Sequence, residues 1–339
     1  MAQQLGERFG ISKCFSDSRE MLQATAPDVV HITTPPQSHY SLATQCLASG
    51  CHVYVEKPFT LYASEAEQLI ALAERQDLKL TVGHDGQFSH AARRMRALIR
   101  SGYLGGRPVH IESTWGYELG DSSYARALLA NKTHWVRGLP GGLLQNLISH
   151  GLAKIAEFLA TDTPEVIAVA FASSFLTRFD KADLVDELRV IITEKEATTA
   201  YFTFSSQMRP ALHQFYIYGP TGSLLLNDDQ QTLIKLRGER YKSYLETFVG
   251  PLVFAKQYIH SCAKNVRLFL ARDFHMASGM KYLIESFYRS IIDGTPVPIP
   301  YREILLTSRI MDTIFEQVAV RSIARTAPFS ALPTLAVPE

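Results

Sequence analysis

The fold is decided by residues 28–58, which read DVVHITTPPQSHYSLATQCLASGCHVYVEKP. Two β-branched runs, 28–32 and 52–55, flank residues 38–49, in which apolar residues recur at helical spacing. Gly50 is well placed to end that helix. A strand, a helix and a second strand in this order predict two parallel strands joined by a right-handed crossover.

The same alternation continues towards the middle of the chain. Residues 63–75 have the pattern of a helix with one apolar face, and residues 78–82 have that of a strand. Residues 3–9 also look helical. We therefore predict an α/β first domain over residues 1–88.

Strand patterns dominate the next part of the chain, so we predict a second, α+β domain with a large, open, mixed sheet over residues 89–323. One late helix of this domain is expected to pack back on the first domain, and residues 324–339 form a loose tail. The expected strands are 109–115, 166–175, 187–193, 198–205, 213–218 and 223–226, and the expected helices are 91–101, 142–159, 280–293 and 302–318.

The composition is that of a globular protein, with 46% hydrophobic and 20% charged residues. Lys and Arg number 34 against 33 for Asp and Glu, so no basic surplus indicates nucleic-acid binding. Neither a signal peptide nor a membrane span is visible, and we expect a cytoplasmic protein with no membrane partner. Residues 231–272 are amphipathic and could form either a substrate lid or an interface.

The four cysteines are Cys14, Cys46, Cys51 and Cys262, and they lack the C-x-x-C spacing of zinc sites. Their neighbours are apolar, which favours reduced, buried thiols in a cytosolic protein. We therefore expect no metal.

Polar residues follow the first predicted strand as Thr33-Thr34-Pro35-Pro36, with His39 shortly after. Two prolines end the strand and fix the loop, so the hydroxyls and amides face the crevice where open α/β sheets bind ligands. The alternative is a plain turn into a helix, with Ser38 as its N-cap.

The second predicted strand ends in Glu56-Lys57-Pro58. The proline holds the lysine extended, and an ammonium group there can hydrogen-bond a substrate hydroxyl and stabilise the oxyanion that forms on it. The alternative is a surface pair of Glu and Lys in a turn.

A third segment, residues 141–150, reads GGLLQNLISH. Its glycines open a predicted helix, and Asn146 and His150 are four residues apart, hence on one helical face. A histidine near its ordinary pKa is a suitable base for a hydroxyl proton. The alternative is a histidine with a structural role only.

The order TPP-x-x-H, EKP and GG-x-x-x-(D/N)-x-x-x-H resembles the Gfo/Idh/MocA dehydrogenases, and the resemblance extends over about residues 5–320. A turn at Gly102-Tyr103-Leu104-Gly105 and the pair Trp135 and Arg137 agree with it. The resemblance implies a truncated Rossmann-type domain, bound NAD or NADP, and oxidation or reduction of a sugar, inositol or nucleotide sugar. It also implies a homo-oligomer, either a dimer or a tetramer.

The resemblance further implies roles for individual residues. The catalytic residues would be Lys57, His150 and Asn146. Cofactor contacts would come from Thr33, Thr34, Pro35, His39, Glu56, Lys57 and Pro58, and substrate contacts from Trp135, Arg137 and Asn146.

Two features depart from the family pattern. Asn146 stands where the family often has Asp, and an amide cannot accept a proton, which leaves His150 to do the acid-base work. No G-x-G-x-x-G occurs in the sequence, so the first βαβ unit and its pyrophosphate site are expected to be missing, and NAD(P) binding to be weak or lost. A late start codon or interrupted gene, a truncated paralogue, or a unit supplied by another chain would each explain this. The alternative function is a non-catalytic sugar-binding or regulatory protein.

Overall fold

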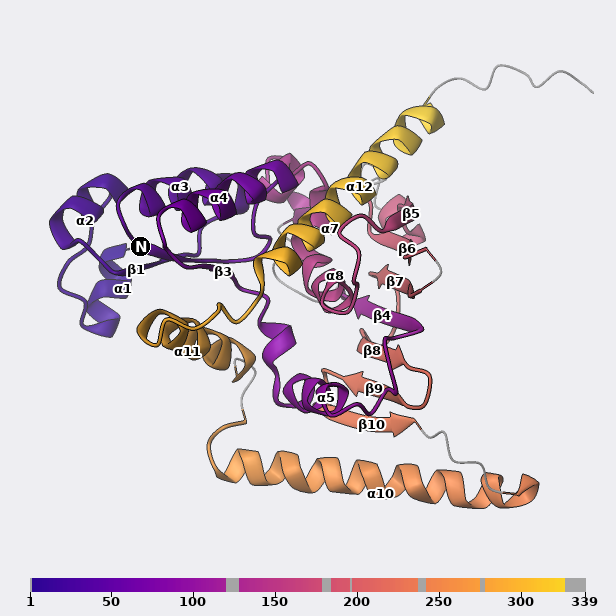
Figure 1. Cartoon of the computed structure of the whole chain (residues 1–339). Helices are drawn as coiled ribbons and strands as arrows, with labels where there is room; N and C mark the ends of the chain where they lie inside the picture. Colours follow the sequence, from indigo (N-terminus) through magenta and orange to yellow (C-terminus); the bar gives the residue numbers. More distant parts are fainter. Residues whose placement is uncertain are drawn as a thin grey trace, which may run out of the picture.

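The computed structural model describes residues 2–119, 128–178, 184–195, 197–236, 242–274 and 278–326. Its strands form one sheet of three strands and one of seven, with helices between them (Figure 1). Within the described residues, none of the helices is both long enough and apolar enough to cross a membrane.

The smaller sheet is parallel, in the order β1-β2-β3. Helices α3 and α4 cover one face, and the late helix α11 lies on the other, where Phe287 is 6.5 Å from the ring of Tyr54 (Figure 1). The prediction of a parallel α/β unit is therefore confirmed. The elements are β1 Val29–Ile32, α3 His39–Ala48, β2 His52–Val55, α4 Ala63–Arg75, β3 Leu80–Val82 and α11 Ser278–Ile292.

Two short helices precede this sheet, α1 (Ala2–Phe9) and α2 (Ser18–Thr25). Helix α2 is absent from the elements predicted from the sequence. Its signal was Asp17, whose carboxylate accepts hydrogen bonds from the backbone amides of Arg19 and Glu20 at 2.8 and 3.0 Å and so caps the helix.

The larger sheet has the strand order β10-β9-β8-β4-β7-β6-β5. Only β4 and β7 pair in parallel among the described neighbours, so the predicted mixed sheet is confirmed. The strands are β4 His110–Gly116, β5 Glu165–Phe171, β6 Glu187–Thr193, β7 Thr199–Ser205, β8 His213–Tyr218, β9 Ser223–Asn227 and β10 Thr232–Leu236.

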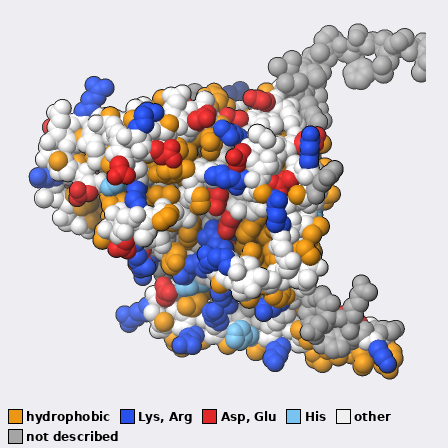
Figure 2. All heavy atoms as spheres, viewed as in Figure 1, with side chains coloured by type: hydrophobic (Ala, Val, Ile, Leu, Met, Phe, Trp, Pro, Cys, Tyr) orange, Lys and Arg blue, Asp and Glu red, His pale blue; other side chains and the backbone are white. Residues whose placement is uncertain are grey.

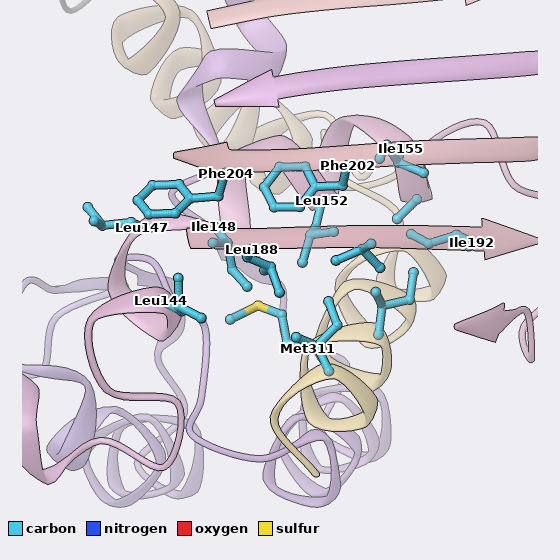
Figure 3. Packing of buried hydrophobic residues seen from close by; sticks show 14 of the residues in the cluster. Leu144, Leu147, Ile148, Leu152, Ile155, Leu188, Ile192, Phe202, Phe204 and Met311 are labelled. Atoms are coloured by element: carbon cyan, nitrogen blue, oxygen red, sulfur yellow. The ribbon is translucent and has the colours of Figure 1, made fainter. Parts of the chain in front are cut away.

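One face of the larger sheet carries the main core. Leu152 and Ile155 of helix α8 pack beside Phe202 and Phe204 of β7 (Figure 3). A Cβ on Gly151 would lie 2.4 Å from the Phe202 ring, so glycine is what lets α8 approach the sheet this closely. The opposite face is open and apolar, with exposed side chains at Ile167, Val169, Phe171, Ile191 and Tyr201.

Helix α12 (Tyr301–Thr326) joins the two halves. Its Ile304 belongs to the core around the smaller sheet, whereas Ile310 and Ile314 belong to the core of the larger one. The division into domains at residues 88 and 323 stays a prediction.

Two expected elements differ in the structure. The helix over 142–159 is broken at Ile148 into α7 (Gly142–Leu147) and α8 (Ser149–Ala156). The strand predicted to reach residue 175 ends at Phe171, because Asp186 accepts hydrogen bonds from the Ser173 amide and hydroxyl, both at 2.7 Å, and so turns the chain into helix α9 (Ser174–Arg178).

The remaining helices are α5 (His90–Arg100) and α10 (Ser243–Leu270), the second of which falls within the amphipathic stretch 231–272. The tail expected from residue 324 begins inside α12, and residues 327–339 lie outside the described part of the chain.

Candidate functional site

The site lies where the three parallel strands of the smaller sheet end. Residues after β1, β2 and β3 form three loops at the same edge, which faces helices α7 and α8 (Figure 1). Carboxyl ends of parallel strands are where open α/β sheets bind ligands.

The loop after β1 leaves Thr33, Thr34 and Pro35 exposed. The Thr34 hydroxyl is 2.7 Å from the Ser38 hydroxyl, which in turn donates to the Pro35 carbonyl at 2.9 Å. Ser38 makes no capping bond to helix α3, so its hydroxyl shapes the loop instead. The exposed Thr and Pro side chains remain accessible to a ligand.

His39 is fully buried between two of the loops. Its Nε2 is 2.8 Å from the Thr34 carbonyl oxygen, and its Nδ1 is 3.0 Å from that of Pro58 and 3.3 Å from that of Phe59. A carbonyl oxygen can only accept, so each contact needs a proton on the ring nitrogen, and a neutral imidazole, which has one N–H, donates to one of the two loops at a time. Any part that His39 plays in cofactor binding therefore acts through the position of these loops.

Lys57 reaches from the end of β2 to the segment 141–150. Its Nζ donates to the backbone carbonyl of Asn146 at 2.9 Å, and the Lys57–Pro58 peptide bond is cis. Burial lowers the pKa of the Lys57 amine, although the charges of Glu56 and Asp85 oppose this. One of the three N–H donors of the ammonium group is thus engaged by a neutral carbonyl, and the carbonyl cannot neutralise its charge.

Glu56 lies behind this lysine against the third loop. A Cβ on Gly83 would be 3.0 Å from both Glu56 carboxylate oxygens, so the glycine makes room for the carboxylate. Burial raises the pKa of the Glu56 carboxyl, and the amide of Lys57, which donates to it at 3.2 Å, works in the opposite sense.

His150, on α8, meets the residues that follow β3. Its Nδ1 is 3.7 Å from a carboxylate oxygen of Asp85 and has no hydrogen-bond partner, and its ring lies 5.9 Å from that of His84 and 5.4 Å from that of Trp115. Burial holds the pKa of His150 well below its ordinary value, and the nearby charge of Lys57 lowers it further. Both effects favour the neutral imidazole, which can accept a proton.

The distal side of His150 is lined by two ion pairs from the larger half of the molecule. The Lys154 ammonium binds the Asp228 carboxylate, and His213 lies 2.6 Å from Asp229. The positive charge of Lys154 lowers the pKa of the His150 imidazole further, so this side of the site also sets the field around His150.

Two of the three predicted substrate residues, Trp135 and Arg137, lie on a short 3-10 helix, η3 (Trp135–Gly138), and the third, Asn146, lies on α7. The side-chain amide of Gln37 donates to the Trp135 carbonyl at 2.9 Å and so ties this turn to the loop after β1. The guanidinium of Arg137 donates to the Leu128 carbonyl at 3.3 Å and borders a cavity of about 260 Å³ between α7 and α12.

Models of one protein family match both halves of the chain. The oxidoreductase family model with an NAD-binding Rossmann fold matches residues 1–84, and the Gfo/Idh/MocA C-terminal domain model matches residues 92–225. The chain belongs to the Gfo/Idh/MocA family.

Two members of the Gfo/Idh/MocA family show how far this chain resembles individual relatives in sequence. The chain is 21% identical to myo-inositol 2-dehydrogenase of Thermotoga maritima over 73% of its own length and 71% of that protein. It is 31% identical to D-glucoside 3-dehydrogenase of Escherichia coli over 31% of its own length, a match that spans only 30% of that relative.

Solved structures of similar fold include the WlbA dehydrogenase of Bordetella pertussis in complex with NADH and UDP-GlcNAcA. The TM-score is 0.71 at 13% identity, over 94% of this chain and 85% of that one. For an NAD-binding oxidoreductase of Klebsiella pneumoniae the TM-score is 0.74 at 20% identity, over 95% of this chain and 85% of that one. At these identities the likeness establishes the fold alone.

The Gfo/Idh/MocA pattern pointed to the ends of β1 and β2 but not to His84 and Asp85. Both follow β3, so the rule that located Lys57 applied to them as well. Trp115 and the pair Lys154–Asp228 carried no such signal, because their positions depend on how the larger sheet packs. Among the described residues, no cluster of three or more His, Cys, Asp or Glu side chains could hold a metal.

Proposed function

We propose that this chain is an NAD(P)-dependent oxidoreductase acting on a hydroxyl or carbonyl group of a sugar, inositol or nucleotide sugar. One observation carries the proposal: the Lys57 ammonium and the His150 imidazole, from different halves of the molecule, share one charged cluster with Asp85. The relatives named as sugar and inositol dehydrogenases support the substrate class.

In the oxidative direction, Lys57 donates a hydrogen bond to the substrate hydroxyl and stabilises the negative charge that develops on its oxygen. Neutral His150 accepts the hydroxyl proton, and the Asp85 carboxylate beside its Nδ1 stabilises the resulting imidazolium. Asn146 orients the substrate or the imidazole. In the reductive direction the same proton returns to the new alkoxide.

A nicotinamide, when bound, accepts or supplies the hydride. The exposed side chains of Thr33, Thr34 and Pro35 fit one edge of such a ligand, with Glu56 and Lys57 at the next strand end. The pyrophosphate half has no G-x-G-x-x-G turn in this sequence. We therefore propose that residues 1–339 alone bind NAD(P) weakly. A titration of NADH with the protein tests this, and a saturable change in NADH fluorescence at micromolar protein concentration would contradict it.

Trp135 and Arg137 are proposed substrate contacts at the outer end of the cleft, where a flat ring and a cation suit a sugar or the phosphates of a nucleotide sugar. Cys46 and Cys51 are buried as expected, whereas the expectation of buried thiols is wrong for Cys14 and Cys262, which are exposed. Free thiols suit a cytoplasmic protein. We also propose that the open apolar face of the larger sheet packs on another copy of the chain.

The second candidate is a non-catalytic sugar-binding or regulatory protein, which the missing glycine turn favours. Turnover of a panel of pyranoses, inositols and nucleotide sugars at millimolar NAD(P)⁺ separates the two. We expect Lys57→Met to reduce turnover by about 10²–10³-fold, and Lys13→Met, which changes an exposed lysine far from the site, to have no effect. Sugar binding without any turnover by the folded chain would favour the second candidate, and equal turnover by Lys57→Met would remove Lys57 from the mechanism.

A further inference from the structure

Helix α10 is the outermost element of the molecule and runs along its lower edge below β10 (Figure 1). Its inner face is fixed to that strand. Gln257 accepts from the Lys235 amide at 2.7 Å and donates to the Lys235 carbonyl at 3.2 Å, and Asn265 donates to the Gln230 carbonyl at 2.9 Å. The opposite face of α10 therefore has a defined orientation, away from the rest of the chain.

The outer face carries a continuous seven-residue repeat, which we call the α10 seam. Its positions alternate in steps of three and four residues, and all of them are exposed, Leu252 and Ile259 at 70% and Phe269 at 67%. Apolar side chains are visible along this edge in Figure 2. The seam consists of Leu245, Phe248, Leu252, Ala255, Ile259, Cys262, Val266 and Phe269.

We propose that two copies of the chain pair through the α10 seam as an antiparallel two-helix coiled coil. A strict repeat of 3.5 residues is the pattern by which helices pack on each other, and four consecutive repeats are long enough for it. The small side chains of Ala255 and Cys262 let two helix backbones come close, whereas they would give a lipid surface little apolar contact. A second helix is thus the better occupant.

The exposed area is that of a stable dimer. At about 150–200 Å² for each fully exposed large side chain, the seam and the neighbouring Leu270 present roughly 800 Å² of apolar surface, about what one partner contributes to a standard interface. A monomer seldom exposes a contiguous apolar patch of more than about 300–600 Å².

The antiparallel arrangement follows from size and charge. It places Leu245 of one copy opposite Phe269 of the other, and Phe248 opposite Val266, so all eight seam positions have a partner and each layer joins a larger and a smaller side chain. It also brings Glu246, at the start of the helix, to within about one turn of Arg272 at the end of the other copy. A two-fold axis relates the copies, as in most homodimers.

Sedimentation velocity of the full chain tests the pairing. We expect Ile259→Asp with Val266→Asp to halve the number of chains per particle, with circular dichroism unchanged. His260→Asp, which adds the same charge on another side of α10, should leave the mass unchanged. An unchanged mass in the double variant, or a monomeric wild type, would overturn the proposal. So would seam-dependent binding of monomers to vesicles of phosphatidylcholine and phosphatidylserine.

Disulfide trapping tests the direction. In a background of Cys14→Ser and Cys262→Ala, we expect an oxidised mixture of Leu245→Cys and Phe269→Cys chains to form the mixed dimer. Dimers of Leu245→Cys with itself would mean that the helices are parallel and would contradict the arrangement.

Discussion

The candidate site has two sides, and the lysines on them have different hydrogen-bond partners. On the wall made by the ends of β2 and β3, Lys57 is bonded to a backbone carbonyl, and His84 Nε2 is buried without a hydrogen-bond partner. On the wall made by α8 and the larger sheet, Lys154 is paired with Asp228. We call these the loop wall and the sheet wall.

The difference separates groups that can react from groups that are already neutralised. A lysine bound to a carbonyl keeps its charge and further donors for a ligand, whereas a lysine bound to a carboxylate is committed to the fold. In the proposed mechanism the same residue type therefore serves chemistry on the loop wall and stability on the sheet wall. His150 lies between the two walls, and groups from both affect its pKa.

The strongest way to break this comparison is to remove the group between the walls. We expect His150→Asn to lower turnover by about 10²–10⁴-fold, because the hydroxyl proton loses its acceptor. The asparagine keeps a polar side chain of similar reach, so thermal unfolding should change little. Steady-state rates with the best substrate of the panel measure the effect, and a rate within threefold of wild type would assign His150 a structural role.

Breaking the ion pair on the sheet wall should lower the free energy of unfolding. Lys154→Met leaves the Asp228 carboxylate without its partner at 15% side-chain exposure, and we expect a loss of about 3–5 kcal/mol in the free energy of unfolding. Adding Asp228→Leu should restore most of it, since neither charge is then left alone. Urea denaturation of the three proteins checks this, and equal stability of Lys154→Met and wild type would show that the pair is not committed to the fold.

A smaller effect is expected at a carboxyl outside both walls. Burial, together with the charge of Glu157, raises the pKa of Glu303 to about 7. A raised carboxyl pKa favours the folded state below the unfolded value near 4.5, and this contribution is lost as the pH rises through 7. Glu303→Gln should therefore be about 1–2 kcal/mol more stable than wild type at pH 8, after allowance for solvent screening, and no more stable at pH 4.5.

Thermal melts at the two pH values measure this difference. An equal gain in stability of Glu303→Gln over wild type at pH 4.5 and at pH 8 would mean that Glu303 keeps an ordinary pKa in the folded chain.

Part of the fold and of the candidate site could be predicted from local patterns in the sequence. The parallel strands and the two polar strand ends, with Lys57 among them, followed from periodicity and from the prolines that stop each strand. The break at Ile148 did not, because the apolar stripe of α7 and α8 runs through it without interruption. The contact of Lys154 with Asp228 joins residues 74 positions apart and is set by the sheet, so no spacing rule reaches it.

Helix α12 limits how the two halves of the molecule can move relative to each other. Ile304 is anchored in one core and Ile314 in the other, and the backbone between them is a rigid rod of about 15 Å. The halves cannot swing apart about their connecting loops unless side chains slide along this rod. Admission of a substrate is therefore expected to depend on loop and side-chain displacements at the rim, with the spacing of the two halves held constant throughout turnover.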